Sequence, residues 1–446
     1  MSHTDLNDHS SLANKNVLPW TRFAPILAIH FLGTLGFSLA IPFLVFIVAD
    51  LGGASWTYGL LGATYSGFQL MGAPLLGRWS DRTGRRPVLV ASQVGTLIAW
   101  LLFFGALSMP VTTLGGLAGA TITLPLVIIF LARALDGGTG GNISVANAYV
   151  ADLTKDTPAI RQQAFGRMGM AASLGFVIGP AVAGILGSTA WGPRLPVLIA
   201  AIFAAVTTIV IIYFLDEPKR RCPEGPPGPG VVEAGLNQQA KPCNTAPAQG
   251  ALRRVIRQGP IALLLVATFI LFLGFNVFYA SFPIHATEMY GWSAGELGLF
   301  FAIMSGFMVV AQGPLLTVAS KYLGHSALFA VGMGFLALAF VCFQVEDDVI
   351  AYVGAAFFAL GNGLSWPTFQ AHVAQVAGEN QGTVQGAVTS ASSLASIVGL
   401  TIGGLVYPLL SGTTFLVSSG IFVLVLLLTP LWFLQPAGGR LSGGGA

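Results

Sequence analysis

Charged residues are scarce in this chain of 446 residues, because Asp, Glu, Lys and Arg together make up only 8% of it. A soluble globular domain carries about a quarter charged residues. A chain this long with so few charges cannot cover a water-facing surface with polar side chains. A soluble enzyme and a nucleic-acid-binding protein are therefore excluded, and the mean hydropathy of +0.77 agrees with this exclusion.

Cysteines and recognisable catalytic motifs are also scarce. The three cysteines, Cys222, Cys243 and Cys342, provide no disulfide framework and lack the spacing of a metal site. The sequence has no phosphate-binding Gly-Lys-Ser/Thr loop and no Ser/His or paired-carboxylate constellation of the kind that enzymes use. We therefore expect no enzymatic activity, no ATP drive, no cofactor and no bound metal.

Long apolar runs are the main positive feature of the sequence. They match the roughly 20 residues that an α-helix needs to cross about 30 Å of hydrocarbon. The polar segment Met1–Trp20 lacks the charged-then-apolar order of a signal peptide, so we expect the first apolar segment to be retained. The runs predict an all-α membrane protein with twelve transmembrane helices at 20–49, 57–78, 87–109, 123–151, 163–188, 195–215, 259–288, 294–319, 326–345, 349–377, 382–410 and 414–434.

A polar stretch separates the sixth and seventh predicted helices. Residues 216–258 are rich in Pro, Gly and charge and have no apolar periodicity, which is typical of a flexible linker. The predicted organisation is a tail (1–19), a six-helix bundle (20–215), the linker (216–258), a second six-helix bundle (259–434) and a second tail (435–446).

The basic residues predict the orientation of the helices. With the N-terminus in the cytoplasm, all but two of the 20 Lys and Arg residues lie in cytoplasmic segments. The exceptions are Arg194 in an outer loop and Arg133 within a helix, while the outer loops carry Asp50 and the acidic run 346–348. The positive-inside rule therefore places both termini and the linker in the cytoplasm.

The two halves of the chain resemble each other, which is the repeat signal of many transporters. Ser66-Gly67-Phe68 recurs as Ser305-Gly306-Phe307, and Pro74-Leu75-Leu76 recurs as Pro314-Leu315-Leu316. The following segments, 80–84 and 320–324, both begin with Ser and end with Gly, and Gly179 and Gly184 match Gly399 and Gly404. The order and near-constant spacing of these matches indicate two pseudo-symmetric bundles that rock about a midplane site.

Three segments carry a resemblance to a known family. Between the second and third predicted helices the chain reads Gly77-Arg78-Trp79-Ser80-Asp81-Arg82-Thr83-Gly84-Arg85-Arg86, which resembles the loop signature of the major facilitator superfamily. Arg133 followed by Gly137, Gly138, Gly140 and Gly141 resembles its second signature. Gly175, Gly179-Pro180 and Gly184 are similar to the antiporter signature of the twelve-helix drug:proton antiporters, in which tetracycline-type and multidrug exporters look most similar.

The resemblance implies a conformational latch at the cytoplasmic rim, made by Gly77, Asp81, Arg82, Gly84, Arg85, Arg86 and Asp152. Asp81 would meet the positive start of helix 11 near Gln381–Thr383 in the outward-facing state, and Arg85 would bridge to Asp152. The alternative is that these charges only anchor the rim, as Arg82 and Arg86 could do. Gly179-Pro180 similarly predicts either an export-biased gate or a simple packing kink.

Arg133 and Asp136 are opposite charges three residues apart on one face of a predicted membrane helix. An ionisable group in hydrocarbon is costly and is a functional candidate by default. Protonation of Asp136 would release Arg133 and couple proton flux to rocking; alternatively, the pair neutralises itself and holds helix 4 against helix 1. His30, His285 and Glu288 are further proton-coupling candidates, although a buried structural histidine and a solvated helix end explain them as well.

Helices 1, 4, 7 and 10 line the central cavity in this family. Their polar and aromatic residues are the candidates for substrate contact, together with Gln69 and Gln312 on helices 2 and 8. His372 either lines the cavity or faces a neighbouring helix, and interhelical hydrogen bonding is the alternative for any one of these residues. The remaining candidates are Asn142, Asn147, Asn276, Tyr279, Asn362, Trp366 and Gln370.

A pocket of amides and aromatic rings suits a hydrophobic or amphipathic organic molecule. The leading interpretation is a monomeric, proton-coupled antiporter of the plasma (bacterial inner) membrane that exports such compounds by alternating access. Its other partners are protons and the lipid bilayer, and no nucleic acid is expected. The alternatives are an exporter or facilitator of one metabolite or lipid, and a non-transporting receptor on the same fold. Transport of many unrelated compounds would favour the first interpretation over the second.

Overall fold

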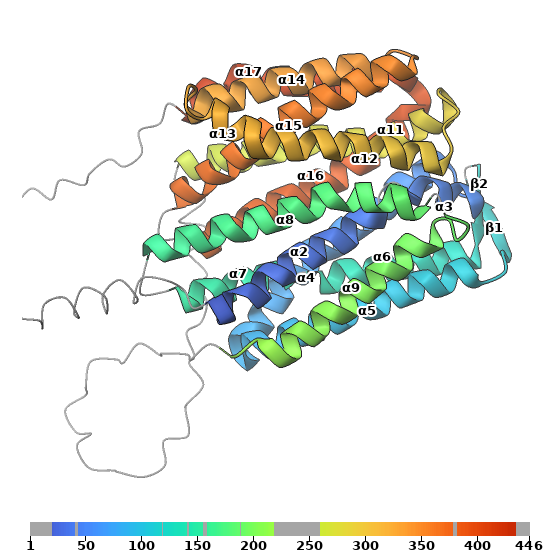
Figure 1. The fold of residues 1–446 in the computed structure, drawn as a ribbon. Helices are drawn as coiled ribbons and strands as arrows, with labels where there is room; N and C mark the ends of the chain where they lie inside the picture. The colour runs from blue at the N-terminus through green and yellow to red at the C-terminus, as the bar shows by residue number, and fades with distance from the viewer. Residues whose placement is uncertain are drawn as a thin grey trace, which may run out of the picture.

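The structure is a computed structural model that describes residues 20–40, 43–117, 119–140, 142–154, 158–187, 189–217, 259–377 and 381–433. The two predicted tails and residues 218–258 of the predicted linker lie outside the described residues. Within the described part, long helices run side by side along one direction (Figure 1). We refer to residues 20–217 as the first half and to residues 259–433 as the second half.

The helices follow the apolar runs of the sequence. Local capping fixes some of their ends: the Ser293 hydroxyl and the Glu296 carboxylate cap each other's backbone N–H groups at the start of α12. The first half contains α2 (Trp20–Ala40), α3 (Leu44–Asp50), α4 (Ser55–Thr83), α5 (Arg85–Ser108), α6 (Leu124–Thr139), α7 (Asn142–Leu153), α8 (Pro158–Gly187) and α9 (Arg194–Phe214). The second half contains α11 (Gly259–Glu288), α12 (Ala294–Val310), the π-helix η3 (Ala311–Leu315), α13 (Leu316–Ala319), α14 (His325–Phe343), α15 (Asp348–Ala377), α16 (Gln381–Leu410), the 3-10 helix η5 (Ser411–Thr413) and α17 (Thr414–Phe433).

Nine segments within the described residues are long and apolar enough to cross a membrane. The predicted count is twelve, and the difference has three sources. One of the nine segments, Gly386–Trp432, includes both α16 and α17, α2 contributes only the shorter stretch Phe23–Gly36, and α4 is absent from the nine. The chain is a multi-pass membrane protein, and the exact count of twelve spans stays a prediction.

The expected all-α fold is corrected in one place, between α5 and α6. Here the chain forms an antiparallel hairpin of β1 (Thr113–Leu117) and β2 (Ala120–Thr123). Thr and Ile favour strands, and Gly119 supplies the positive φ of +81° that the tight turn requires. The hairpin lies at one end of the helix array (Figure 1), which we call the hairpin end.

The segment expected as a loop between the second and third helices is also corrected, because it is almost entirely helical. The helix α4 continues to Thr83 and α5 begins at Arg85, so only Gly84 separates them. Gly84 has a φ of +119°, which a side chain would disfavour, whereas Gly77 lies within α4. The glycine of the tight turn is therefore Gly84, at the end of the array opposite the hairpin, which we call the junction end.

The two halves meet along two helix pairs, α4 with α16 and α8 with α12. Glycines allow backbones to touch at both seams. A Cβ on Gly404 would lie 3.1 Å from the Cα of Gly59, and a Cβ on Gly298 would lie 2.5 Å from the Cα of Gly184. Close glycine-mediated packing is how membrane helices associate without a hydrophobic driving force between them.

Candidate functional site

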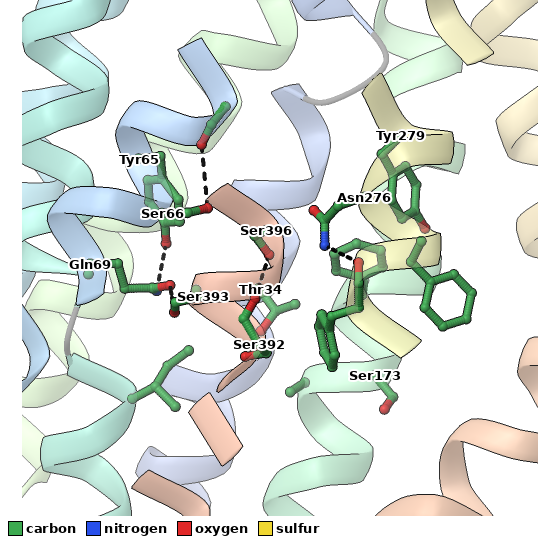
Figure 2. A pocket seen from close by; sticks show the side chains of 18 of the residues that line it. Thr34, Tyr65, Ser66, Gln69, Ser173, Asn276, Tyr279, Ser392, Ser393 and Ser396 are labelled. Carbon is green, nitrogen blue, oxygen red and sulfur yellow. Dashed lines mark hydrogen bonds between the residues drawn. The ribbon is translucent and has the colours of Figure 1, made fainter. Parts of the chain in front are cut away.

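A cavity of about 430 Å³ lies between the two halves and takes its walls from both (Figure 2). Its size is within the range of small-molecule sites. The first half contributes Ile29, His30, Gly33, Thr34, Leu44, Tyr58, Gly62, Tyr65, Ser66, Gln69, Gln93, Thr96, Trp100, Arg133, Asp136, Gly140, Ile143, Gly169, Ala172, Ser173, Phe176 and Val177. The second half contributes Phe272, Phe275, Asn276, Tyr279, Met308, Gln312, Asn362, Trp366, Gln370, Ser392, Ser393, Ser396 and Leu400.

The structure brings most of the cavity candidates together. Seven of them line this space: Gln69, Asn276, Tyr279, Gln312, Asn362, Trp366 and Gln370. Asn147 does not line the cavity: Ile143 of α7 does, and Asn147 is buried four residues further along the same helix. His372 is bonded to the backbone of Trp432 and so faces α17 rather than the cavity. The side chain of Asn142 lies outside the described residues.

The sequence interpretation missed a polar stripe on α16 and several aromatic walls. Ser392, Ser393 and Ser396 line the cavity from α16, and Tyr65 and Trp100 line it from α4 and α5. Ser392 and Ser396 are four residues apart and so share a helix face, and the adjacent Ser393 borders that face. That spacing is a signal that the sequence contains; the two aromatic residues have no comparable local signal.

The ion pair predicted on the fourth membrane segment is present in α6. The Arg133 guanidinium lies 3.1 Å from the Asp136 carboxylate, and both residues are 5% exposed. The guanidinium also lies over the ring of Tyr65, 4.5 Å from its centroid, and 5.9 Å from that of Trp100. Thr96 makes a side-chain hydrogen bond to Asp136. Salt bridge, hydrogen bond and cation–π contacts together compensate the burial of both charges.

A chain of contacts runs from this ion pair to the second half. Tyr65, below the Arg133 guanidinium, accepts a hydrogen bond at its hydroxyl from the amide nitrogen of Gln69, at 3.2 Å. The amide oxygen of Gln69 accepts one from the hydroxyl of Ser393 on α16, at 3.1 Å. Figure 2 shows Gln69 between Tyr65 and Ser393. The buried charges of α6 are thus linked through α4 to the opposite half.

The three histidine and glutamate candidates fall into two places. His30 is 5% exposed, lines the cavity from α2, and its Nε2 has no hydrogen-bond partner in the described structure. His285 is buried at the hairpin end, where its Nδ1 lies 3.0 Å from the hydroxyl of Tyr407. Glu288, three residues further, is exposed and hydrogen-bonded to Ser55 across the seam between the halves. Only His30 shares the cavity with the ion pair.

Two more hydrogen bonds cross the seam beside the cavity. The hydroxyl of Tyr58 donates to the backbone carbonyl of Tyr279 at 2.7 Å. The indole nitrogen of Trp366 donates to the hydroxyl of Ser173 at 3.1 Å. These side chains therefore bridge the halves as well as lining the cavity.

The latch candidates gather at the junction end. The Arg85 guanidinium pairs with Asp81 on α4 and with Asp152 on α7, with Nε 2.9 Å from the Asp152 carboxylate. The side chains of 381–383 lie outside the described residues, so the predicted contact of Asp81 with the start of helix 11 stays a prediction. Arg82 is exposed, while Arg86 donates to the backbone carbonyl of Ile212 on α9.

Glu217 belongs to this cluster although it was assigned to the linker. Its carboxylate accepts hydrogen bonds from the backbone N–H groups of Arg85, at 2.7 Å, and Arg86, at 2.8 Å. The first N–H groups of a helix have no acceptor within the helix itself, and the positive N-terminus of α5 favours an anion there. Glu217 follows α5 by more than a hundred residues, so only the tertiary fold reveals this contact.

The glycines of the antiporter-like motif have different neighbours along α8. Gly175 and Gly179 face α2, where the Ser38 hydroxyl donates to the carbonyl of Gly175 at 3.1 Å. Gly184 instead faces Gly298 of α12, across the seam between the halves. Pro180 lies inside α8, which continues unbroken from Pro158 to Gly187. The motif thus binds α8 to its own half and to the other half at once.

Comparison with known proteins gives a consistent result. The sequence model of the Major Facilitator Superfamily matches residues 26–345 and residues 264–443. The chain is 25% identical over 408 residues to the class D tetracycline resistance protein of Salmonella ordonez, covering 90% of this chain and 94% of that protein. It is 27% identical over 419 residues to multidrug resistance protein 2 of Bacillus subtilis (strain 168), covering 92% and 95%.

Solved structures are similar in fold. The human organic anion transporter MFSD10 (TETRAN) superimposes with a TM-score of 0.63 at 22% identity, over 92% of this chain and 99% of that one. The xylose transporter XylE from E. coli, in a partially occluded inward-open conformation, superimposes with a TM-score of 0.64 at 16% identity, over 93% and 100%. At these identities the likeness concerns the fold alone.

Proposed function

Since the chain belongs to the Major Facilitator Superfamily, and is therefore a transporter rather than an enzyme, we propose that it is a proton-coupled antiporter that exports hydrophobic or amphipathic organic compounds. The observation that carries the proposal is a cavity walled by aromatic rings and neutral amides that also contains a buried, protonatable ion pair. The naming of two relatives as tetracycline and multidrug resistance proteins supports the choice of substrate class.

The lining of the cavity favours an amphipathic, weakly charged compound. Aromatic rings such as Phe176, Phe272 and Trp366 supply apolar area, and Gln370 has an amide oxygen without a hydrogen-bond partner among the described residues. The charges of Arg133 and Asp136 offset each other, so the wall carries no strong net field that would demand an anion or a cation. This arrangement suits many related organic shapes rather than a phosphate or a densely hydroxylated sugar.

Coupling follows from the ion pair and its contacts. A proton taken up by Asp136 removes the negative charge that pairs with the Arg133 guanidinium, which weakens the hold of α6 on that side chain. Its displacement moves Tyr65, and with it the Gln69 amide that bonds Ser393 on the opposite half. The protonation state of one buried carboxyl thereby biases how the two halves meet, which is the differential contact that a two-state switch requires.

The proposed topology has twelve membrane spans in two six-helix bundles, with both termini and the junction end in the cytoplasm and the hairpin end outside. The glycine seams at α4–α16 and α8–α12 and the Arg85 cluster would form and break as access alternates. The cavity is complete within one chain, so a monomer suffices for transport.

Purified protein in proteoliposomes tests the proposal. An imposed pH gradient should drive uptake into inside-out vesicles for several unrelated members of a panel of lipophilic cations, tetracyclines and neutral drugs. Each transported compound should also release protons when the gradient is absent. Transport of a single compound would favour a specific exporter instead, and failure of every compound to move or to release protons would refute the proposed function.

A further inference from the structure

The repeated sequence pattern in α4 is one residue shorter than its counterpart in α12 and η3. Pro74 follows Ser66 by eight residues, whereas Pro314 follows Ser305 by nine. Both stretches begin with Ser-Gly-Phe and end with Pro-Leu-Leu, so the second half has one additional residue between two matched anchors. In an uninterrupted α-helix one extra residue would rotate everything beyond it by about 100°.

The additional residue coincides with the π-helix. The helix α4 is α-helical throughout from Ser55 to Thr83, although it contains Pro74. The matching stretch of the second half contains η3, a π-helix at Ala311–Leu315, between α12 and α13. A π-turn bonds residue i to i+5 rather than i+4 and thus accommodates an extra residue without rotating the flanking helix, and such turns are frequent at functional sites.

The packing of the two stretches shows that the extra residue of the second half is one of two, Gln312 or Gly313. Gly72 and Ala311 each lie six residues after the serine of their pattern. Each packs on a glycine of the adjacent helix in its own half: Gly72 on Gly138 at the end of α6, and Ala311 on Gly363 of α15, where a Cβ on Gly363 would lie 2.5 Å from that of Ala311. Before the proline, α4 then has one residue, Ala73, and η3 has two, Gln312 and Gly313.

Gln312 is the member of this pair that meets the cavity. It lines the cavity beside Met308, whereas Gly313 is exposed and has nothing within 4 Å of its Cβ position. Within the described part of the chain no hydrogen bond occupies the Gln312 amide. The insertion therefore adds a free hydrogen-bonding group to the wall while leaving the packing of both flanks in place.

We propose that the one-residue insertion in η3 determines specificity, because it presents the Gln312 amide to a hydroxyl, carbonyl or amide group of the transported compound. This inference rests on the proposed transport function and names a residue that selects among its substrates. Gln312 bonds polar groups that the aromatic walls cannot recognise. Compounds without such groups gain nothing from it.

Two deletions test the insertion. Deletion of Gln312 should restore the spacing of α4 and close the π-turn, so the protein should stay monodisperse with a thermal unfolding midpoint close to that of the wild type. Deletion of Ala73 at the matching position of α4 is the control, since no π-turn can absorb it, and this variant should fail to fold. Equal destabilisation by the two deletions would refute the interpretation of Gln312 as an extra residue that the π-turn accommodates.

Two substitutions that keep the backbone, Gln312→Ala and Gln312→Leu, test the selectivity. In proteoliposomes, we expect the ratio of kcat/KM for tetracycline to that for tetraphenylphosphonium to fall about three- to tenfold, the effect of one lost hydrogen bond. Ser390→Ala, on an exposed position of α16, should leave the ratio unchanged. A wild type that moves both compounds with a ratio unaffected by Gln312→Ala would refute this inference alone. A wild type that moves neither these two compounds nor any other member of the panel would refute the transport function, and the inference with it.

Discussion

The two halves of the chain contribute different chemistry to the same cavity. The first half supplies the charged pair Arg133 and Asp136 and the titratable His30. The second half supplies, among the described residues that line the cavity, only neutral side chains: phenylalanines, a tyrosine, a tryptophan, a methionine, a leucine, amides and serines. A related difference occurs in the matched segments 80–84 and 320–324: Ser-Asp-Arg-Thr-Gly has two charges of opposite sign, whereas Ser-Lys-Tyr-Leu-Gly has a single positive charge.

This difference divides the roles of the proposed transport between the two halves. A buried charge is costly, so a single well-compensated pair suffices for coupling and a second one would add only cost. The neutral half is then free to vary its lining for recognition. Gln69 is the contact where the two roles meet, because it joins the Tyr65 side of the ion pair to Ser393 of the neutral half.

The largest effect is expected at the charged pair. Asp136→Asn removes the protonatable group but keeps the hydrogen-bonding shape of the side chain. Accumulation driven by a pH gradient should fall by about a hundredfold, the upper range of coupling between two sites, while equilibrium binding of a labelled substrate persists. Asp50→Asn, the same change at an exposed position at the end of α3, is the matched control. An Asp136→Asn protein that still concentrates substrate normally would show that coupling lies elsewhere.

A smaller effect is expected in the neutral half. Trp366 packs edge-on against Phe272 at 5.5 Å between ring centroids and donates to Ser173 across the seam. Trp366→Ala should weaken substrate binding about 30-fold, as loss of a buried aromatic anchor does, measured by titration of purified protein. The number of protons exchanged per substrate should not change. Trp366→Phe keeps an aromatic ring but removes the hydrogen bond to Ser173, so it separates the two contributions. A changed number of protons per substrate in either variant would contradict the assignment of coupling to the first half and recognition to the second.

A further reduction, smaller than the two above, is expected at Gln69, which links the halves. Gln69→Leu breaks its bonds to Tyr65 and Ser393, so gradient-driven transport should fall about three- to tenfold, a typical change for a residue within a coupling network. Binding should change less than transport. Ser393→Ala should have a similar effect, and the double variant should be no worse than either single one, since both remove one connection. Fully additive losses would argue against a shared route.

The smallest effect is expected at the rim of the first half. Asp152 is half-exposed in its pair with Arg85, and such exposed pairs contribute at most about 1 kcal/mol. Asp152→Asn should therefore lower the free energy of unfolding by no more than this amount, as measured by chemical denaturation in detergent. If the pair is part of a latch, the variant should also shift the ratio of inward to outward accessibility in a cysteine-labelling assay. An unchanged accessibility ratio would show that the Arg85 cluster only anchors the rim and is not a latch.

The sequence predicted the helices closely because membrane helices depend on local composition. The predicted helix 259–288 coincides with α11, and most other boundaries agree within a few residues. Two features differ from the prediction. The helix α4 extends through the charged stretch up to Thr83, and the α5–α6 connection forms a hairpin around Gly119. A pattern of apolar runs alone does not resolve either feature.

The candidate site was predictable where charge made a residue conspicuous. Arg133 and Asp136 stood out because ionisable groups are rare in apolar segments, and their spacing of three already placed them in contact. Tyr65, Ser393 and Glu217 did not stand out, because each acts on a partner from another element. Asn147 and His372 looked equivalent to the cavity residues in sequence, and only their packing places them elsewhere.

By itself, the sequence determined that this is a multi-pass membrane protein with an ion pair in its fourth predicted span and a signature of charged residues at one rim. These properties follow from hydropathy, spacing and charge, which act locally along the chain. Only the tertiary structure decided which side chains share the cavity, how Gln69 connects the ion pair to Ser393, and that the π-helix η3 accommodates the extra residue of the second half. Such features depend on which helices pack side by side and on their rotation, and long-range packing rather than local propensity fixes both.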